Sequence, residues 1–69
     1  MKQKPLENCV HEKRREQGLT QAELAEAVGV TRQTIIAIEK GNYEPSVRLA
    51  LNLSNTLKTP VEKLFFIRS

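Results

Sequence analysis

Apolar residues recur at helical spacing along the 69-residue chain, and glycine or proline interrupts this pattern at regular places. Each interruption coincides with a change in the apolar pattern, so the sequence predicts a series of short helices. The predicted helices cover roughly residues 6–17, 20–29, 31–40 and 46–57, with a short fifth helix from 59. Gly18 is placed to end the first helix in a left-handed conformation.

Helix starts carry their own local signals. Thr20 and Glu23 have the spacing of a capping box, in which the threonine hydroxyl accepts from the Glu23 amide and the carboxylate accepts from the Thr20 amide. Thr31 and Ser46 are placed to cap the third and fourth helices in the same way. The sequence therefore predicts well-defined starts for these three helices.

Two signals mark the C-terminal residues. Residues 59–62 combine Thr59 as an N-cap, proline at the first helical position and Glu62 as the capping-box glutamate, which predicts the start of the fifth helix. Residues 65–67 can form a short extended tail that pairs with the N-terminal residues. No other stretch alternates well enough to predict a strand.

The segment 21–40 meets the packing requirements of two helices joined by a tight turn. Two apolar residues share a face of each helix, and these are Leu24 and Val28 in the second and Ile35 and Ile38 in the third. Gly29 permits a positive backbone φ in the turn, and Val30 points back into the core. Ala25 is the small residue expected where two helices cross closely. The sequence predicts a helix-turn-helix motif here.

This chain resembles the XRE, or Cro/repressor-type, helix-turn-helix regulators over about residues 6–66. The motifs that carry the resemblance are Gly-Leu-Thr-Gln (18–21), Thr-Arg-Gln-Thr-Ile (31–35), Ile-Glu-Lys-Gly (38–41) and Pro-Ser (45–46). It implies an all-α, five-helix, lambda-repressor-like domain, and a length of 69 residues leaves room for this single domain over residues 1–69. It also implies a sequence-specific transcriptional regulator, with the third helix in the major groove of double-stranded DNA and homodimers on palindromic operators. A domain without an effector-binding region more often represses, by occupying its site.

The outward face of the third helix contains the candidates for reading bases. Arg32 can direct two donors at the major-groove acceptors of guanine, and Gln33 can exchange hydrogen bonds with adenine. Ile36 either contacts a thymine methyl group or is an incidental apolar residue on the surface, and the two interpretations are equally well supported.

A second group of residues is expected to contact the DNA backbone. Gln21 begins the second helix, where a side-chain amide and free backbone amides suit a phosphate oxygen. Tyr43 either donates to a phosphate or packs the loop that follows the third helix. The other backbone candidates, which rest on family position, are Thr31, Thr34, Lys40 and Asn42.

Arg14 and Glu39 fall on otherwise inward helical faces. The resemblance pairs them as a structural salt bridge between the first and third helices, so Arg14 is not expected to bind DNA. Cys9 is interpreted as a small, half-buried apolar residue because no resolving cysteine is present. His11 stands among charged residues and is expected to be solvated.

Dimer formation is expected to use the C-terminal region. On the fourth helix, the predicted inward stripe contains Val47, Ala50, Leu51, Ser54 and Leu57, which leaves Leu49 and partly Leu53 facing elsewhere. The last apolar residues of the chain cannot all point inward. The predicted dimer interface therefore contains Leu49, Leu53, Phe65, Phe66 and Ile67.

Composition narrows the function classes further. The net charge of +3 is a mild basic bias that a mixed, solvated surface also explains. An enzyme is not expected, because the chain has no nucleophile–base pair, glycine-rich phosphate loop or Cys/His cluster for a metal, and no cofactor is expected. The single cysteine excludes an internal disulfide. No apolar run approaches a membrane span, so the expected location is a reducing cytoplasm.

The sequence leaves two alternative binding functions. An antitoxin-type regulator, which binds its operator and also masks a toxin partner, is compatible with the sequence. RNA binding is less well supported because the chain has few aromatic residues for stacking on bases.

Overall fold

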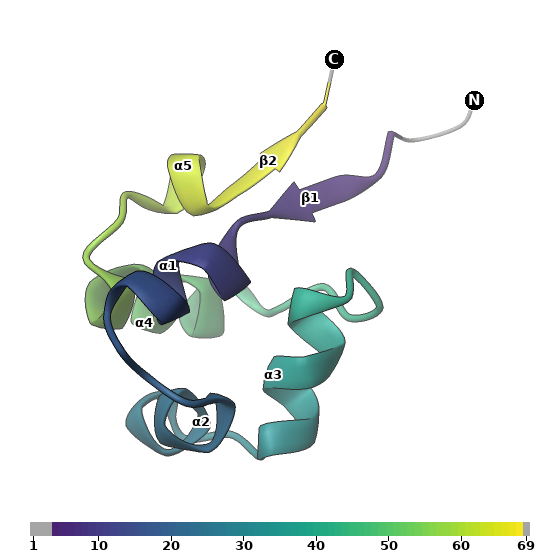
Figure 1. The fold of residues 1–69 in the computed structure, drawn as a ribbon. Helices are drawn as coiled ribbons and strands as arrows, with labels where there is room; N and C mark the ends of the chain where they lie inside the picture. The colour runs from purple at the N-terminus through teal and green to yellow at the C-terminus, as the bar shows by residue number, and fades with distance from the viewer. Residues whose placement is uncertain (1–3, 69) are drawn as a thin grey trace.

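The computed structural model describes residues 4–68. Within this range the elements are β1 (Leu6–Asn8), α1 (Val10–Glu16), α2 (Gln21–Val28), α3 (Arg32–Glu39), α4 (Val47–Leu57), α5 (Val61–Leu64) and β2 (Phe65–Ile67). Figure 1 shows α2 and α3 at one end of the molecule and the two strands at the other. The predicted helical domain is confirmed, and its short extended tail is part of a two-stranded antiparallel sheet.

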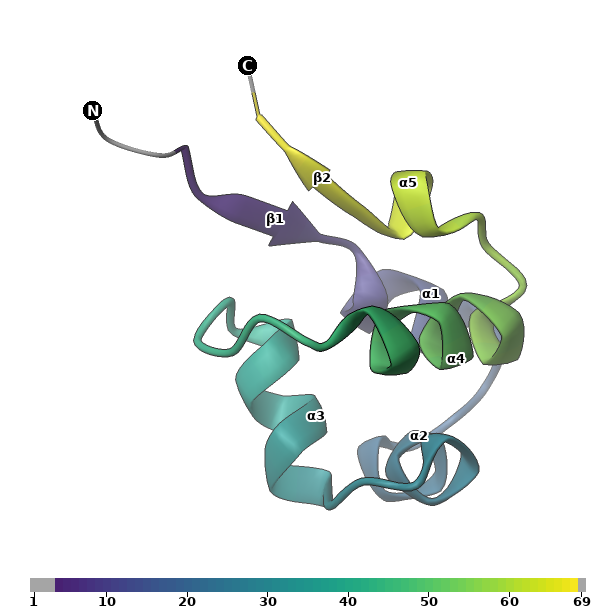
Figure 2. The same cartoon turned by 180° about the vertical axis from the view of Figure 1, so that it is seen from behind.

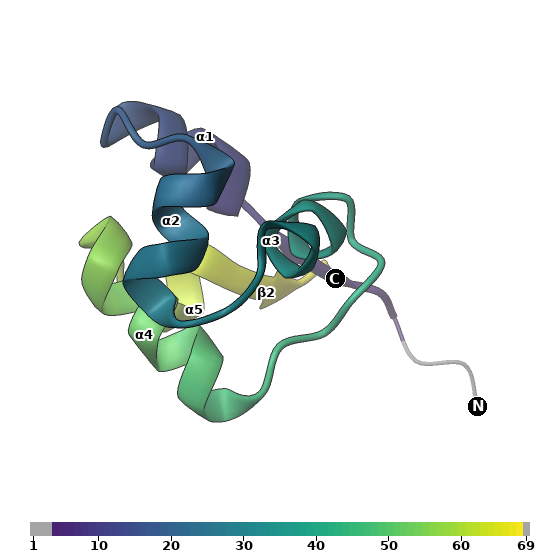
Figure 3. The ribbon, with the colours of Figure 1, turned by 90° about the horizontal axis from the view of Figure 1, so that it is seen from below.

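One apolar core joins all five helices. Its buried members are Val10, Leu24, Ala25, Val28, Ile35, Ile38, Leu49, Leu53, Leu57 and Leu64. Figure 2, which views the domain from behind, shows α4 in front of α1, and Figure 3 shows α3 nearly end-on beside α2. Because each helix contributes at least one side chain to the same cluster, burial of apolar surface holds α2 and α3 at a fixed mutual orientation.

The predicted start of α2 is confirmed in detail. The amide of Glu23 donates to Thr20 Oγ1 at 3.0 Å, and the amide of Thr20 donates to Glu23 Oε1 at 2.8 Å. Both halves of the capping box are therefore formed. Ser46 caps α4 as predicted, by accepting from the amide of Leu49 at 3.1 Å.

The turn between α2 and α3 also follows the sequence prediction. Gly29 ends α2 with a φ of +77°, a left-handed conformation that costs glycine little. The amide of Val30 then donates to Ala25 O at 3.0 Å, and the Val30 side chain packs against the core. Thr31 caps α3 by accepting from the Thr34 amide at 3.3 Å.

The predicted start of the first helix is wrong. Residues 6–8 form β1, which pairs with β2 in the register Leu6 opposite Ile67, and α1 begins only at Val10. Asn8 Oδ1 accepts from the amide of Val10 at 3.0 Å, which ends the strand and satisfies a free amide of the first turn. The pairing between the N-terminal residues and the tail, however, was predicted correctly.

The predicted cap of the fifth helix is also wrong. The helix comprises Val61–Leu64, its N-cap residue is Pro60, and no side chain caps it. Thr59 is buried and instead donates its hydroxyl to Leu57 O at 3.0 Å, while its amide donates to Ser54 O. Thr59 therefore belongs to the C-terminal end of α4 and is not available to α5.

The inward face of α4 differs from the predicted one. Leu49 and Leu53 belong to the core, whereas Val47 is 76% exposed and Leu51 is 50% exposed. Two overlapping stripes exist on this helix, and the one that packs has leucines at every fourth position, 49, 53 and 57. These large side chains fill the space between α4 and its neighbours, which alanine and serine on the other stripe would leave open.

Candidate nucleic-acid interface

The outer face of α3 presents polar side chains from its first turn. Arg32 and Gln33 are the first two residues of the helix, and both are exposed. On the opposite face Ile35 and Ile38 are fully buried, with no exposed surface. The rotation of α3 about its own axis is therefore fixed by the core, which determines that residues 32 and 33 point away from the body.

Ile36 is half-buried. It lies four residues after Arg32, so the two side chains share a face of the helix. This position is compatible with contact to a thymine methyl group and equally with an isolated surface apolar residue.

The other expected DNA-contacting residues surround α3. The hydroxyls of Thr31 and Thr34 lie 3.1 Å apart and hydrogen-bond to each other at the start of the helix. Lys40 is exposed at the C-terminal end, and Asn42 and Tyr43 are exposed in the loop that follows. The amide of Asn42 donates to Ala37 O at 2.8 Å, which holds this loop against the end of α3.

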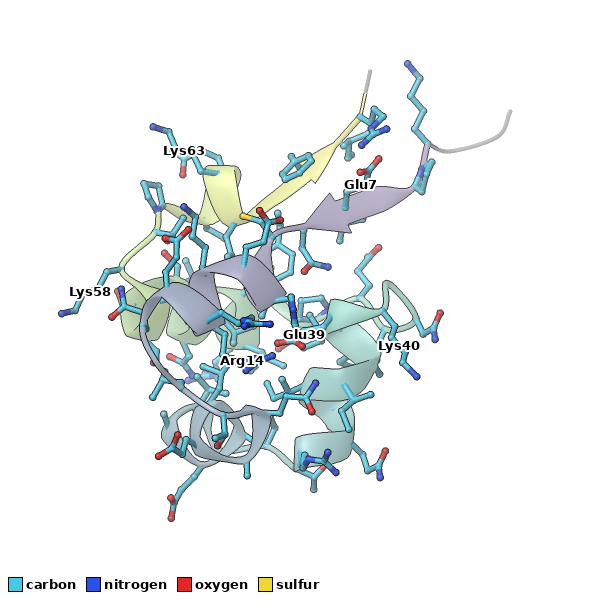
Figure 4. All side chains as sticks on the ribbon, in the orientation of Figure 1. Glu7, Arg14, Glu39, Lys40, Lys58 and Lys63 are labelled. Carbon is cyan, nitrogen blue, oxygen red and sulfur yellow. The ribbon has the colours of Figure 1, made fainter. Side chains whose placement is uncertain are left out.

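Glu39, the last residue of α3, is the centre of a polar cluster between helices. Arg14 Nε of α1 donates to Glu39 Oε2 at 2.7 Å, and the side chains of the two residues are only 10% and 6% exposed. Figure 4 shows the two side chains pointing toward one another from α1 and α3. The ion pair implied by the family resemblance is present. Arg14 Nη1 also donates to Leu19 O at 2.8 Å, so the guanidinium of Arg14 is hydrogen-bonded to groups inside the fold.

The charge of Glu39 is stabilised by several donors. Burial by itself raises the pKa of the carboxyl group, but hydrogen bonds from Arg14, Gln21 and His11, together with the charge of Arg14, outweigh burial and lower it. Glu39 is thus held as a carboxylate that accepts from residues of α1 and α2. This arrangement ties the C-terminal end of α3 to the start of α2.

Gln21 and His11 have contacts that the sequence interpretation missed. Gln21 Nε2 donates to Glu39 Oε1 at 3.1 Å, and His11 Nδ1 lies 3.2 Å from the same oxygen. His11 is therefore not simply solvated. The signal available in the sequence was its position three residues before Arg14, which places both side chains on one face of α1.

Comparison with known proteins identifies the class of this site. A helix-turn-helix family model matches residues 10–64. The chain belongs to the XRE-type helix-turn-helix family. The members of this family are DNA-binding transcriptional regulators and not enzymes.

Similar regulators occur in archaea and bacteria. The chain is 51% identical over 63 residues to an uncharacterized HTH-type transcriptional regulator of Methanothermobacter thermautotrophicus, covering 90% of this chain and 91% of the relative. It is 45% identical over 62 residues to the uncharacterized HTH-type transcriptional regulator YgzD of Bacillus subtilis, covering 90% and 94%.

Two solved structures show the same arrangement of helices. The P22 c2 repressor, in complex with a synthetic operator, matches with a TM-score of 0.75 and 28% identity, over 77% of this chain and 80% of the repressor. The restriction-modification controller protein C.AhdI of Aeromonas hydrophila matches with a TM-score of 0.72 and 28% identity, over 78% of each chain. The predicted lambda-repressor-like fold is thereby confirmed.

Cys9 of the regulator lies away from the outer face of α3. Its Sγ donates to Lys63 O at 3.3 Å, and the residue is half-buried against the core. Burial raises the pKa of the thiol, which disfavours the reactive thiolate. This agrees with its interpretation as a small apolar residue.

Residues 4–68 of the regulator contain no group of three or more histidine, cysteine, aspartate or glutamate side chains that could hold a metal ion. Within the same range, no helix is both long and apolar enough to cross a membrane.

Proposed function

We propose that this regulator represses transcription by binding a palindromic operator as a homodimer, with α3 in the major groove of each half-site. The observation that carries the proposal is the pair of exposed polar residues, Arg32 and Gln33, on the first turn of a helix whose opposite face is locked into the core. A helix presented in this way can insert its N-terminal residues into the major groove, where they meet the edges of the bases.

Each candidate residue has a role in this proposal. Arg32 reads guanine, Gln33 reads adenine and Ile36 contacts a thymine methyl group. Gln21 contacts a phosphate at the start of α2, where a helix offers amides without an intrahelical partner. The remaining backbone contacts are Thr31, Thr34, Lys40, Asn42 and Tyr43.

The similarity to a repressor that was solved with an operator supports the repressor role. Occupying a promoter-proximal site is sufficient for repression and needs no further domain. A selection of preferred sites from random duplex DNA with the purified regulator tests the proposal, and it should return an inverted repeat with half-sites about one helical turn apart. Recovery of unrelated or single half-site sequences would contradict the palindromic operator.

The homodimer is proposed to use exposed apolar residues near the two-stranded sheet. Val47 of α4 and Ile67 of β2 line one open groove of about 540 Å³, and Leu51 follows Val47 by one helical turn. Ile67 is 64% exposed and Phe66 is 39% exposed. The apolar groove between α4 and β2 is typical of an interface, whereas Phe66, which alternates with Phe65 and Ile67 along β2, lies on the other face of the sheet. The groove replaces the predicted contribution of the buried Leu49 and Leu53.

Sedimentation of two charge-adding variants tests this interface. Leu51→Lys places a cation on the proposed contact surface and should shift the regulator toward monomer at micromolar concentration. Ala27→Lys adds the same charge at an exposed position of α2 and should sediment like the wild-type chain. A wild-type chain that is monomeric at high micromolar concentration would contradict the homodimer.

A further inference from the structure

The outward line of α3 has a polar residue at each end. Ile35 and Ile38 set the inward direction of the helix, because neither has any exposed surface. At about 3.6 residues per turn, Gln33 and Lys40 then point almost directly away from the core. Both are exposed, and they lie about two turns apart, at the start of α3 and just beyond its end. The middle of the outer face is the turn between them.

Ile36 and Ala37 occupy this middle turn, one on either side of the outward line. Both are half-buried, so each presents part of its surface to whatever lies against the helix. Neither side chain has a hydrogen-bond donor or acceptor. The middle of the outer face can therefore distinguish base pairs only by apolar contact or by the shape of the groove.

The two side chains differ in size, which determines how close a base can come on each side. Ala37 has a single methyl group, so a base edge can approach the helix backbone closely there. Ile36 has a longer, branched side chain that fills more of the groove on the other side. The apolar group that a base presents in the major groove is the C5-methyl of thymine. Contact between such a methyl group and either side chain removes apolar surface from water and is favourable.

We propose that Ala37, together with Ile36, reads the C5-methyl groups of pyrimidines in the middle of each half-site. Ala37 is then a specificity-determining residue in addition to the contacts proposed above. Because 5-methylcytosine carries its methyl group on the same ring atom as thymine, these two side chains also distinguish it from cytosine. The inference rests on the proposed placement of α3 in the major groove and adds the reading of the middle base pairs.

Replacing thymine by uracil tests the inference, because it removes the methyl group and keeps the base pairing. Fluorescence anisotropy with operator duplexes that carry uracil at one thymine position of each half-site, at one ionic strength, measures the effect. At one or two positions the Kd should rise by about fourfold for each half-site, as expected for the loss of one buried methyl group. The same replacement at the other positions should change the Kd little.

Cytosine methylation gives a second readout with the same wild-type chain. A C·G pair placed at a uracil-sensitive position should bind about fourfold more tightly per half-site when the cytosine is 5-methylated. The gain should equal that of thymine over uracil, because neither Ile36 nor Ala37 can bond to the other groups of the pair. Equal affinity for cytosine and 5-methylcytosine at these positions would contradict the reading of methyl groups.

Two variants connect the sensitive positions to the two side chains. Ile36→Ala should reduce the uracil effect at one position and leave it at the other. Ala37→Gln adds an amide that can bond to adenine, so it should remove the uracil effect at its own position and change the preferred base pair there. Ala27→Gln adds the same amide at an exposed position of α2 and should keep the wild-type uracil profile. Circular dichroism confirms that each variant is folded.

The outcomes separate this inference from the proposed function. Wild-type binding that tolerates uracil at every position would overturn the reading of methyl groups and leave DNA binding intact. A selected operator without thymine in the middle of its half-sites would also overturn it. An unchanged uracil profile in folded Ala37→Gln would overturn the role of Ala37. Absence of binding to any duplex would contradict the DNA-binding function and, with it, this inference.

Discussion

Two ion pairs with nearly equal lengths lie in different halves of the molecule. In the half formed by α1, α2 and α3, Arg14 Nε is 2.7 Å from Glu39 Oε2, and both side chains are almost completely covered. In the two-stranded sheet, Arg68 Nε is 2.8 Å from Glu7 Oε2, but these side chains are 74% and 30% exposed. The two distances alone would suggest equal contributions to stability. The difference in exposure indicates that the contributions are unequal.

The difference shows where the fold depends on polar contacts. An exposed pair is screened by water and is worth about 0–1 kcal/mol, while removing one partner of a buried pair leaves an uncompensated charge and costs about 3–5 kcal/mol. The helices that carry the proposed DNA-binding face are therefore locked by a buried polar cluster. The half containing α4, α5 and the sheet relies on apolar packing and leaves apolar side chains exposed.

The largest expected effect comes from breaking the buried pair. Arg14→Ala should lower the free energy of unfolding by about 3 kcal/mol, because Glu39 would keep a buried charge without its main partner. Arg68→Ala is the matched variant and should lower it by less than about 1 kcal/mol. Urea denaturation monitored by circular dichroism measures the free energy of unfolding of both variants. Equal losses would remove the proposed distinction between the two halves.

A second prediction concerns the DNA-binding face itself. Arg32→Ala should weaken operator binding by about 1–3 kcal/mol per half-site and relax the preference at one base pair. Gln21→Ala should weaken specific and non-specific duplexes alike, because its proposed contact is a phosphate. Binding to the operator, to its single-base variants and to random DNA at one salt concentration distinguishes the two. If Arg32→Ala kept the wild-type ranking of all operator variants, Arg32 would not be a base-reading residue.

Acid should weaken the half that contains Glu39. The pKa of this carboxyl group is lowered in the folded chain from its ordinary value of 4.5, so its contribution to stability is present above that pH. The contribution is lost as the pH falls through the lowered pKa of the folded state. The free energy of unfolding of the wild-type chain should therefore exceed that of Glu39→Gln most at neutral pH. Below pH 4.5 the two values should converge, and a constant difference from pH 7 to pH 3 would contradict this role.

Features that depend on nearby residues could be predicted from the sequence, whereas features that depend on packing between helices could not. The starts of α2, α3 and α4 and the turn at Gly29 depend on residues within a few positions of one another, and these were predicted correctly. The inward face of α4 depends on what the other helices present to it, and two apolar stripes satisfied the local pattern equally. Leu49 and Leu53 were consequently assigned to the wrong side.

Sequence reasoning predicted which residues belong to the candidate site but did not predict all of their contacts. The pairing of Arg14 with Glu39 came from the family resemblance, and the exposure of Arg32 and Gln33 came from helical spacing. The contact of His11 with Glu39 joins α1 to α3 across 28 positions of the sequence, and only the packed fold brings these two residues together.

The smallest expected effect tests the C-terminal half at the end of α4. Lys58 ends this helix in a left-handed conformation, with φ of +54°, and it is the only non-glycine residue with positive φ among residues 4–68. Its side chain points into solvent in Figure 4, so no contact offsets the steric cost. That cost is about 1–2 kcal/mol, and glycine would remove it while increasing the entropy of the unfolded chain by a smaller amount.

Lys58→Gly should therefore raise the free energy of unfolding by about 0.5 kcal/mol, measured as an increase in the urea midpoint at unchanged slope. Asn52→Gly is the matched control, because it introduces glycine at an exposed position inside α4, and it should lower the midpoint instead. Operator affinity should be unchanged in Lys58→Gly, because Lys58 is not one of the proposed DNA-contacting residues. A loss of stability in Lys58→Gly would contradict the steric cost assigned to the left-handed conformation at the end of α4.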